Sequence, residues 1–298
     1  MITVTNLAIQ FGKKTLYKDV NLKFTSGNIY GIIGANGAGK STVIRHILGI
    51  YKEDSGSVTI DGTPVWDNQS VKERCASIPD DWYYFPNATI KEMMHYYKGI
   101  YKNFSVERYE KLKEAFPIDE KKMIRHLSKG MQKQVAFWLA LSTMPECLIL
   151  DEPVDGLDPV MRRQVWSLMM SDVSERGTTV LVSSHNLREL EDVCDHVGIM
   201  DKGKVLIERD LTELQDNMVK LQVVFGADVT EVPKDIPVLH VSKLGRVFTL
   251  IMRMNAERAM EVLKPYSPML VDAIPLTLEE IFIYELGGEN YEVKDIVI

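Results

Sequence analysis

Short apolar runs alternate with amphipathic segments along the first two thirds of the chain. Residues 2–11, 20–33 and 56–62 are rich in β-branched and aromatic side chains, which predicts strands. Residues 40–51 instead carry apolar side chains at helical spacing. This alternation predicts a mixed α/β fold.

The middle of the chain, from Ile90 to Leu141, has almost no β pattern. Helical spacing of apolar residues recurs there in residues 90–101, 105–116 and 129–143. Two apolar runs follow, residues 147–153 and 178–185, and a helical stretch separates them, as in the βαβ units of a parallel sheet. The pattern predicts an α/β domain, residues 1–210, that contains a helical subdomain at about residues 88–145.

After Leu211 the pattern changes to that of a small α+β accessory domain, residues 211–298. Two β-rich runs, a short helix capped by Asn255 and a further strand are expected. A last helix is predicted to begin at Thr277, where Glu280 is spaced for a capping box.

Composition narrows the functions that such a chain can have. The 298 residues, 45% of them hydrophobic, suffice for one large domain and a small one. A net charge of −7 disfavours a nucleic-acid binder or a protein held on anionic lipid by a basic surface. The three widely spaced cysteines suggest neither a disulfide framework nor a zinc site, so a reducing cytoplasm is the simplest setting. No window approaches the roughly 18 apolar residues of a membrane span, so we expect any membrane part to come from a partner.

The stretch IIGANGAGKST, Ile32 to Thr42, concentrates glycine before a lysine and two hydroxyl residues. It matches G-x-x-x-x-G-K-[ST] between a predicted strand and a predicted helix, the context in which backbone N–H groups cradle phosphates. Lys40 would reach the terminal phosphates and the Ser41 hydroxyl would bind Mg²⁺. The expected nucleotide-binding residues are Gly34, Asn36, Gly37, Gly39, Lys40, Ser41 and Thr42. The alternative is a glycine-rich turn that only joins a strand to a helix, and the context favours the phosphate site.

A second set of motifs decides between the classes of nucleotide-binding protein. The segment LSKGMQ, residues 127–132, followed by a helix and by CLILDEP, resembles the signature and Walker B strand of ATP-binding cassette (ABC) ATPases. Ser128 lies 151 − 128 = 23 residues before Asp151, the interval of that family. The remaining family motifs lie around it in the expected order. They are Phe11, which would stack on adenine, the D-loop at Gly156 to Asp158, and the switch histidine His185. The resemblance covers about residues 1–210 and implies a P-loop fold of the ABC type.

The resemblance also implies roles for these residues in ATP hydrolysis. Asp151 ends an apolar strand at the sheet edge where nucleotides bind, so it can support Mg²⁺ together with Ser41. Glu152 would polarise the attacking water, and His185 would bridge towards the γ-phosphate. Without a functional role, Asp151 and Glu152 would be a solvated acidic pair at a strand end. Phe11 would then be an ordinary aromatic residue of the core.

Ser128 and Gly130 imply a second subunit, because the signature of the family that this chain resembles contacts the nucleotide bound by another chain. Asp158 of the D-loop is a further expected nucleotide-binding residue. The signature LSKGM and the C-terminal LEEIF resemble those of bacterial exporter ATPases. Such a subunit works with separate membrane permease subunits at the cytoplasmic face of the cell membrane, without a span of its own and without nucleic acid.

Three departures from the family pattern concern the nucleotide contacts. Lys129 and Met131 replace the usual Gly and Gln of the signature, and Asp80 stands where a glutamine is expected. An aspartate can still reach Mg²⁺ through water. The aromatic residues that follow, from Trp82 to Tyr101, are expected to include exposed rings that dock a membrane subunit.

Two other functions stay open on the sequence alone. A soluble ABC protein of translation or DNA repair needs no permease, but those proteins usually carry two cassettes or a long coiled-coil insertion, and neither is visible. A regulatory ATP-binding module with little turnover is conceivable because of Asp80 and Met131. Steady ATP hydrolysis separates the transporter from the regulatory module, and co-purification with membranes separates it from the soluble protein.

Overall fold

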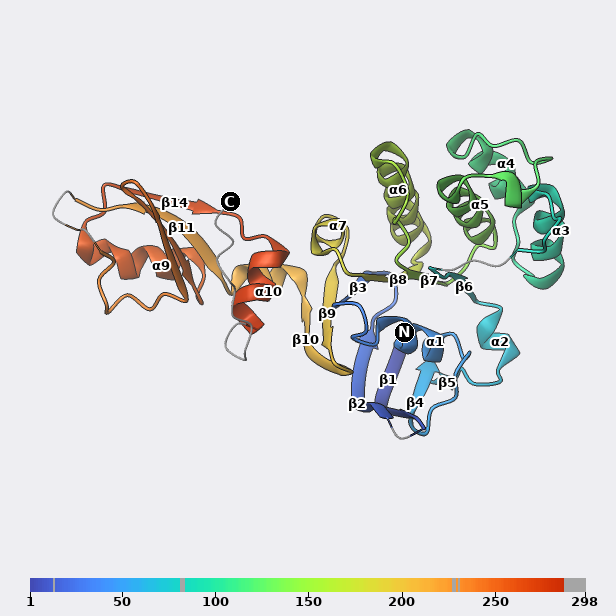
Figure 1. Ribbon diagram of the computed structural model, residues 1–298, viewed down its shortest axis with the longest axis horizontal. Helices are drawn as coiled ribbons and strands as arrows, with labels where there is room; N and C mark the ends of the chain where they lie inside the picture. The colour runs from blue at the N-terminus through green and yellow to red at the C-terminus, as the bar shows by residue number, and fades with distance from the viewer. Residues whose placement is uncertain (13, 81–83, 227–228, 230, 287–298) are drawn as a thin grey trace. The chain divides into compact units, whose positions relative to one another are not determined.

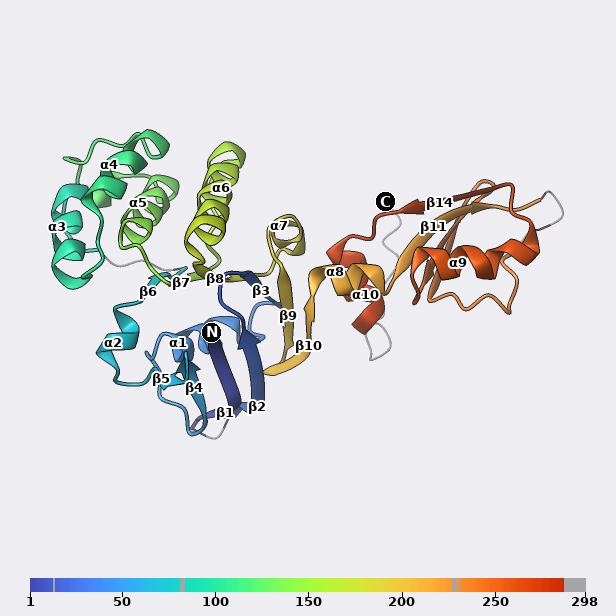
Figure 2. The ribbon, with the colours of Figure 1, turned by 180° about the vertical axis from the view of Figure 1, so that it is seen from behind.

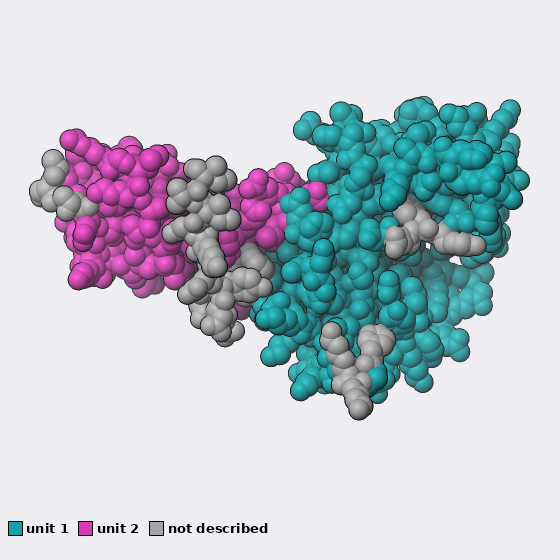
Figure 3. All heavy atoms as spheres, viewed as in Figure 1, with its two compact units in different colours: residues 1–186, 193–208 teal, residues 187–192, 209–298 magenta. Residues whose placement is uncertain are grey.

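The structure, a computed structural model, describes residues 1–12, 14–80, 84–226, 229 and 231–286 (Figure 1). The side chains of Phe11, Lys14, Gln215, Phe282, Glu285 and Leu286 are also outside the description. The chain forms two compact units, residues 1–186 with 193–208 and residues 187–192 with those from 209 onward (Figure 3). No helix in the described part combines the length and the apolar character that a membrane crossing needs.

The first unit contains two sheets. One is antiparallel, in the order β2-β1-β4-β5, and consists of β1 (Ile2–Phe11), β2 (Lys14–Phe24), β4 (Ser55–Ile60) and β5 (Thr63–Pro64). The other has six strands in the order β10-β9-β3-β8-β7-β6. Its members are β3 (Ile29–Ile33), β6 (Cys75–Ile78), β7 (Cys147–Asp151), β8 (Thr179–Ser184), β9 (His196–Asp201) and β10 (Lys204–Asp210). The pairs that join β9, β3, β8, β7 and β6 are parallel, which confirms the predicted α/β core.

Strands β3, β7 and β8 are buried at every residue, because both faces of the six-stranded sheet are covered. The antiparallel sheet and α1 (Lys40–Ile47) cover one face, and their apolar side chains share a core with Ile32, Ile149 and Leu181 of the sheet. Helices α5 (Lys129–Ser142) and α6 (Pro159–Arg176) lie on the other face (Figures 1 and 2). Since β3, β8 and β7 are parallel neighbours, the loops that follow them leave the sheet at the same edge.

The stretch from Ile90 to Ser142 contains three helices, as predicted, namely α3 (Ile90–Ile100), α4 (Val106–Ala115) and α5. Each helix begins at a side-chain cap, Thr89, Ser105 and Ser128 in turn. Trp138 of α5 is fully buried, stacks on Tyr109 with ring centroids 4.6 Å apart and donates its indole N–H to the Tyr109 carbonyl. This pair holds α4 against α5. The short α2 (Gln69–Lys72) precedes β6.

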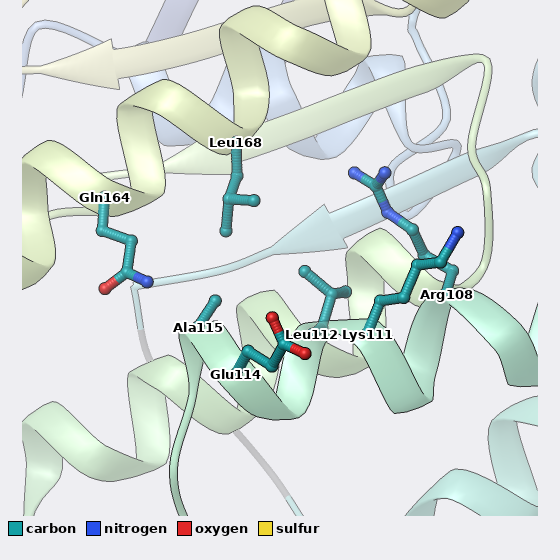
Figure 4. Close-up of a pocket in the computed structure, with 7 residues that line it drawn as sticks. All are labelled: Arg108, Lys111, Leu112, Glu114, Ala115, Gln164 and Leu168. Carbon is teal, nitrogen blue, oxygen red and sulfur yellow. The ribbon is translucent and has the colours of Figure 1, made fainter.

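Helices α4 and α6 flank a cavity of about 330 Å³ (Figure 4). Beside it, Asp172 of α6 is almost fully buried and forms ion pairs with Arg108 of α4 and with Arg176. Burial raises the pKa of Asp172, and the two guanidinium groups oppose the rise. The ion pair with Arg108 therefore joins the helical stretch to a helix of the sheet core, whereas the pair with Arg176 lies within α6. The cavity lining is Arg108, Lys111, Leu112, Glu114, Ala115, Gln164 and Leu168.

The second unit contains an antiparallel sheet in the order β12-β13-β11-β14. Its strands are β11 (Val219–Val224), β12 (His240–Leu244), β13 (Val247–Met252) and β14 (Leu270–Ile274). Alternate residues of β11 and β13 form a core with α9 (Ala256–Leu263). The unit also contains α7 (Leu187–Glu191), α8 (Leu211–Asp216) and α10 (Leu278–Leu286).

Two helix starts in this unit confirm the sequence prediction. Asn255 accepts a hydrogen bond from the backbone N–H of Arg258, and Thr277 forms the capping box with Glu280. The second β-rich run forms a hairpin of two strands, β12 and β13, which turns at Gly245, where φ is +61°. One predicted helix was too long. The helix expected over 40–51 ends at Ile47, because Gly49 adopts a left-handed conformation.

Candidate functional site

The loop between β3 and α1 fits only glycine at two of its positions. A Cβ on Gly34 would lie 2.3 Å from the carbonyl oxygen of Met200, and one on Gly39 would lie 2.6 Å from the Tyr17 ring. Gly39 also has a φ of +112°. Asn36 and Gly37 are exposed at the tip of this loop. The expected phosphate loop therefore lies where the sequence places it, ahead of Ser41 and Thr42 in the first turn of α1.

Lys40 folds back over the loop. Its side chain is 5% exposed and its Nζ donates to the Gly34 carbonyl oxygen at 2.7 Å. The same ammonium group lies 3.3 Å from Oε1 of Glu152. A lysine ammonium group over a glycine-rich loop at the start of a helix is an arrangement suited to phosphate groups.

Glu152 is the meeting point of three loops. It follows β7, and its other carboxylate oxygen, Oε2, accepts from Nδ1 of His185 at 3.0 Å and from the His185 backbone N–H at 3.3 Å. His185 follows β8, and Lys40 follows the loop after β3. The structure thus brings together the three residues that the sequence proposes as catalytic.

The backbone of Glu152 adopts φ +47°, a left-handed conformation that costs a residue other than glycine on the order of 1–3 kcal/mol. Ser183 of β8 accepts from the Glu152 N–H at its carbonyl oxygen and at its hydroxyl, both at 3.2 Å. The same hydroxyl donates to Asp151, which ends β7 and is 7% exposed. Ser183 therefore holds both Asp151, the last residue of β7, and Glu152, which follows it, a role that the sequence did not reveal.

Lys133, from the second turn of α5, was also missed by sequence reasoning. Its side chain is 5% exposed, and Nζ donates to the carbonyl oxygens of Glu152 at 2.7 Å and Asp155 at 3.0 Å. Burial lowers the pKa of Lys133, while the carboxylates of Asp155, Asp80, Glu152 and Asp151 act in the opposite direction. Asp80, which is exposed just after β6, therefore lies within electrostatic reach of this group.

The signature residues lie beside the D-loop. Ser128 is exposed and caps α5 by accepting from the Met131 N–H at 3.3 Å. A Cβ on Gly130 would lie 2.9 Å from the Gly156 carbonyl oxygen. Asp158 caps α6 by accepting from two backbone N–H groups at 3.0 Å. The structure thus brings Gly130 of the signature against the D-loop, and it brings Lys40 and His185 together at Glu152.

The stacking of Phe11 on adenine stays a prediction, and the side chain of Phe11 is outside the description. As metal ligands, Ser41, Asp80 and Asp151 offer the hydroxyl and carboxylate oxygens that Mg²⁺ prefers. The potential ligand atoms of Glu152, Asp155 and His185 also lie within 4.8 Å of one another. That second group includes an imidazole nitrogen, which suits Mg²⁺ less well than an all-oxygen set.

Comparison with known proteins gives consistent matches. A family model described as ABC transporter matches residues 17–155. YtrB of Bacillus subtilis (strain 168), an ABC transporter ATP-binding protein, is 31% identical over 290 residues, which cover 97% of this chain and 99% of YtrB. BcrA of Bacillus licheniformis, a bacitracin transport ATP-binding protein, is 30% identical with 97% and 98% covered. A solved structure of the ATP-binding subunit of an ABC transporter has a TM-score of 0.68 and 28% identity, and the match covers 72% of this chain and 92% of that one.

Proposed function

This chain belongs to the ATP-binding subunits of ABC transporters, and from that membership we propose which of its residues carry out the reaction. The protein is an ATPase that couples ATP binding and hydrolysis to transport through membrane subunits. We assign this reaction to the cassette, residues 1–210 with its helical subdomain at about residues 88–145, and regard residues 211–298 as an accessory domain.

In this proposal Lys40 and the N–H groups of the loop from Gly34 to Thr42 bind the phosphates of ATP. Bound Mg²⁺ would neutralise phosphate charge, held by Ser41 and Asp151, with Asp80 acting through water. The convergence of Lys40, Glu152 and His185 on one point supports these assignments. A nucleotide phosphate bound by Lys40 would then lie next to the carboxylate of Glu152.

Glu152 is proposed to polarise the attacking water. Its carboxylate is held by His185 and Lys40, so it is fixed in direction before the reaction begins. His185 is 46% exposed, so its ring can turn towards a γ-phosphate without disturbing the core. Phe11, at the end of β1, is proposed to stack on the adenine.

Ser128 and Gly130 are proposed to act on the nucleotide of a second ATPase subunit, and Asp158 of the D-loop is proposed to contribute to nucleotide binding. Ser128 and Gly130 lie beside the D-loop of their own chain, and the start of α5 offers N–H groups to an anion. Ser128→Arg should abolish ATP-dependent dimerisation, measured by light scattering, while each monomer still binds ATP. A variant that dimerises with ATP like the wild type contradicts the shared site.

An aromatic cluster on the helical subdomain is proposed to dock a membrane permease subunit. Its exposed members are Phe85, 49% exposed, and Tyr96, 46% exposed, whose ring centroids are 4.9 Å apart. Tyr97 and Tyr101 continue the cluster with stacked rings 5.6 Å apart. Such rings supply a large buried area at small entropic cost.

The first rings of the expected docking stretch, Trp82 to Tyr84, are not suitable positions for a test substitution. Trp82 and Tyr83 lie outside the described residues, and Tyr84 is partly buried, with its hydroxyl donating to the Gln132 carbonyl oxygen at 3.4 Å. Tyr96→Ser should therefore keep basal ATPase activity and lose the recovery of activity with membrane partners. Trp66→Ser, at another ring that is 40% exposed, is the matched control. Equal responses of the two variants to the partners would remove the aromatic cluster from the proposal.

The subunit is proposed to work at the cytoplasmic face of the cell membrane and to serve an exporter. BcrA is described as a bacitracin transport protein, and it matches this chain over nearly its whole length. The test is an ATPase assay of the purified chain with Mg²⁺. The wild type should hydrolyse ATP, whereas Lys40→Ala should bind ATP weakly and lose turnover. Binding without turnover in the wild type would favour a regulatory module instead.

A further inference from the structure

Lys133 is a buried cation whose two observed hydrogen bonds both go to the main chain of another element. It lies on α5, five residues after Ser128, and its Nζ donates to the carbonyl oxygens of Glu152 and Asp155 at 2.7 Å and 3.0 Å. Taking an ammonium group out of water is costly unless it finds good partners. The buried ammonium group of Lys133 is therefore stabilised by these two carbonyl oxygens, and it holds their backbone in place.

The backbone that Lys133 binds is held in an unfavourable conformation. Glu152 has a φ of +47°, and such conformations persist only where neighbouring groups determine them. Ser183 binds the N–H of Glu152, and Lys133 binds its carbonyl oxygen. With both peptide groups held, the carboxylate is directed towards Lys40 and His185.

A second contact joins the same two segments. Gly130 of α5 approaches Gly156 so closely that a Cβ would lie 2.9 Å from the Gly156 carbonyl oxygen. The turn from Glu152 to Gly156 is therefore held by α5 at two points one turn apart. Since Ser128 caps α5, the helix that would contact the second subunit's nucleotide also holds the turn that carries this chain's own Glu152.

We propose that Lys133 is a positioning residue for ATP hydrolysis, which holds the backbone of Glu152 in place from the signature helix. The inference rests on the proposed role of Glu152. Lys133 does not touch the nucleotide in this scheme, and it acts only through the direction of the Glu152 carboxylate. Its loss should therefore slow turnover without weakening ATP binding.

The test compares Lys133→Met with the wild type in kcat and in the equilibrium Kd for ATP. Lys133→Met keeps the side-chain length and removes the donors, so kcat should fall about 10- to 100-fold, the effect of misplacing a reacting group by about 1 Å. Kd should stay within about twofold, because the phosphate loop is unchanged. Lys133→Arg, which keeps donors for two carbonyls, should recover part of the lost kcat. Lys111→Met, at an exposed lysine of α4, is the matched control and should leave both constants unchanged.

Thermal melting monitors the fold of each variant. Should Lys133→Met fail to fold, Lys133→Gln, which keeps an amide donor, is measured in the same way, with the same expected split between kcat and Kd. Unchanged kcat in a folded variant, or equal loss of kcat and ATP affinity, would overturn the role of Lys133. A failure of the proposed function would look different from a failure of the role of Lys133. In that case the wild type would lack ATP turnover, or Glu152→Gln would retain it.

Discussion

Replacing Gly39 by alanine should damage the phosphate loop far more than the same replacement at Gly37. Both glycines have positive φ, +112° and +86°, so an alanine is strained at either position. They differ in their surroundings: a Cβ at Gly37 meets nothing within 4 Å, whereas one at Gly39 lies 2.6 Å from Cε1 and Oη of Tyr17. The pair therefore separates the cost of the backbone conformation from the cost of the contact.

The expected magnitudes follow from these contacts. Tyr17 is 1% exposed and its hydroxyl donates to the Gly39 carbonyl oxygen, so the ring cannot move into solvent to make room. Overpacking of this kind costs about 1–3 kcal/mol in addition to the backbone strain of about 1–3 kcal/mol. We expect Gly39→Ala to lose about 1–3 kcal/mol more free energy of unfolding than Gly37→Ala.

Urea denaturation of the two variants, followed by intrinsic fluorescence, measures this difference. Gly39→Ala is also measured in a Tyr17→Val background, where the ring is absent, and it should cost less free energy of unfolding there than in the wild type. Equal losses for Gly39→Ala and Gly37→Ala, or the same cost of Gly39→Ala in both backgrounds, would refute the packing of Tyr17 behind the loop.

Three further predictions concern pH, a buried ion pair and the metal. Burial raises the pKa of Tyr17 to about 12, so its contribution to stability is complete below pH 10 and is lost as the pH rises towards 12. Between pH 9 and pH 12 the free energy of unfolding of the wild type should fall by up to about 2–3 kcal/mol because of Tyr17. Tyr17→Phe has no hydroxyl to titrate, so this part of the fall should be absent in the variant. Asp172→Ala leaves the guanidinium groups of Arg108 and Arg176 without their buried partner and should cost about 3–5 kcal/mol by urea denaturation, whereas Glu107→Ala, at an exposed ion pair, should cause no measurable change. Chelation of divalent cations should abolish ATP turnover, and added Mg²⁺ should restore it in a steady-state assay.

The sequence predicted the elements whose signal is local. Glycine spacing before Lys40, and the apolar run that ends at Asp151, depend on a few adjacent residues, so the phosphate loop and the β7 edge could be placed. The caps at Asn255 and Thr277 are local in the same sense. Local patterns can also predict an element that is too long. Residues 40–51 were expected to be helical, but α1 ends at Ile47.

The contacts that arise from folding could not be predicted in this way. Lys133 meets Glu152 from 19 positions away and Ser183 meets Asp151 from 32, and neither spacing forms a pattern along the chain. The available signal for Lys133 was a cation just before the continuously buried stretch from Val135 to Ser142. Such a residue must find polar partners inside the fold, although the sequence does not say which.

The hydrolysis rate of Glu152→Gln tests the central assignment most directly. The amide keeps the size of the side chain but cannot act as a base, so kcat should fall at least about 100-fold. ATP affinity should be equal or higher, because Lys40 no longer pairs with a carboxylate when the phosphate arrives. The variant and the wild type are purified and assayed in the same way. Near-normal turnover with normal ATP binding in Glu152→Gln would contradict the role of Glu152.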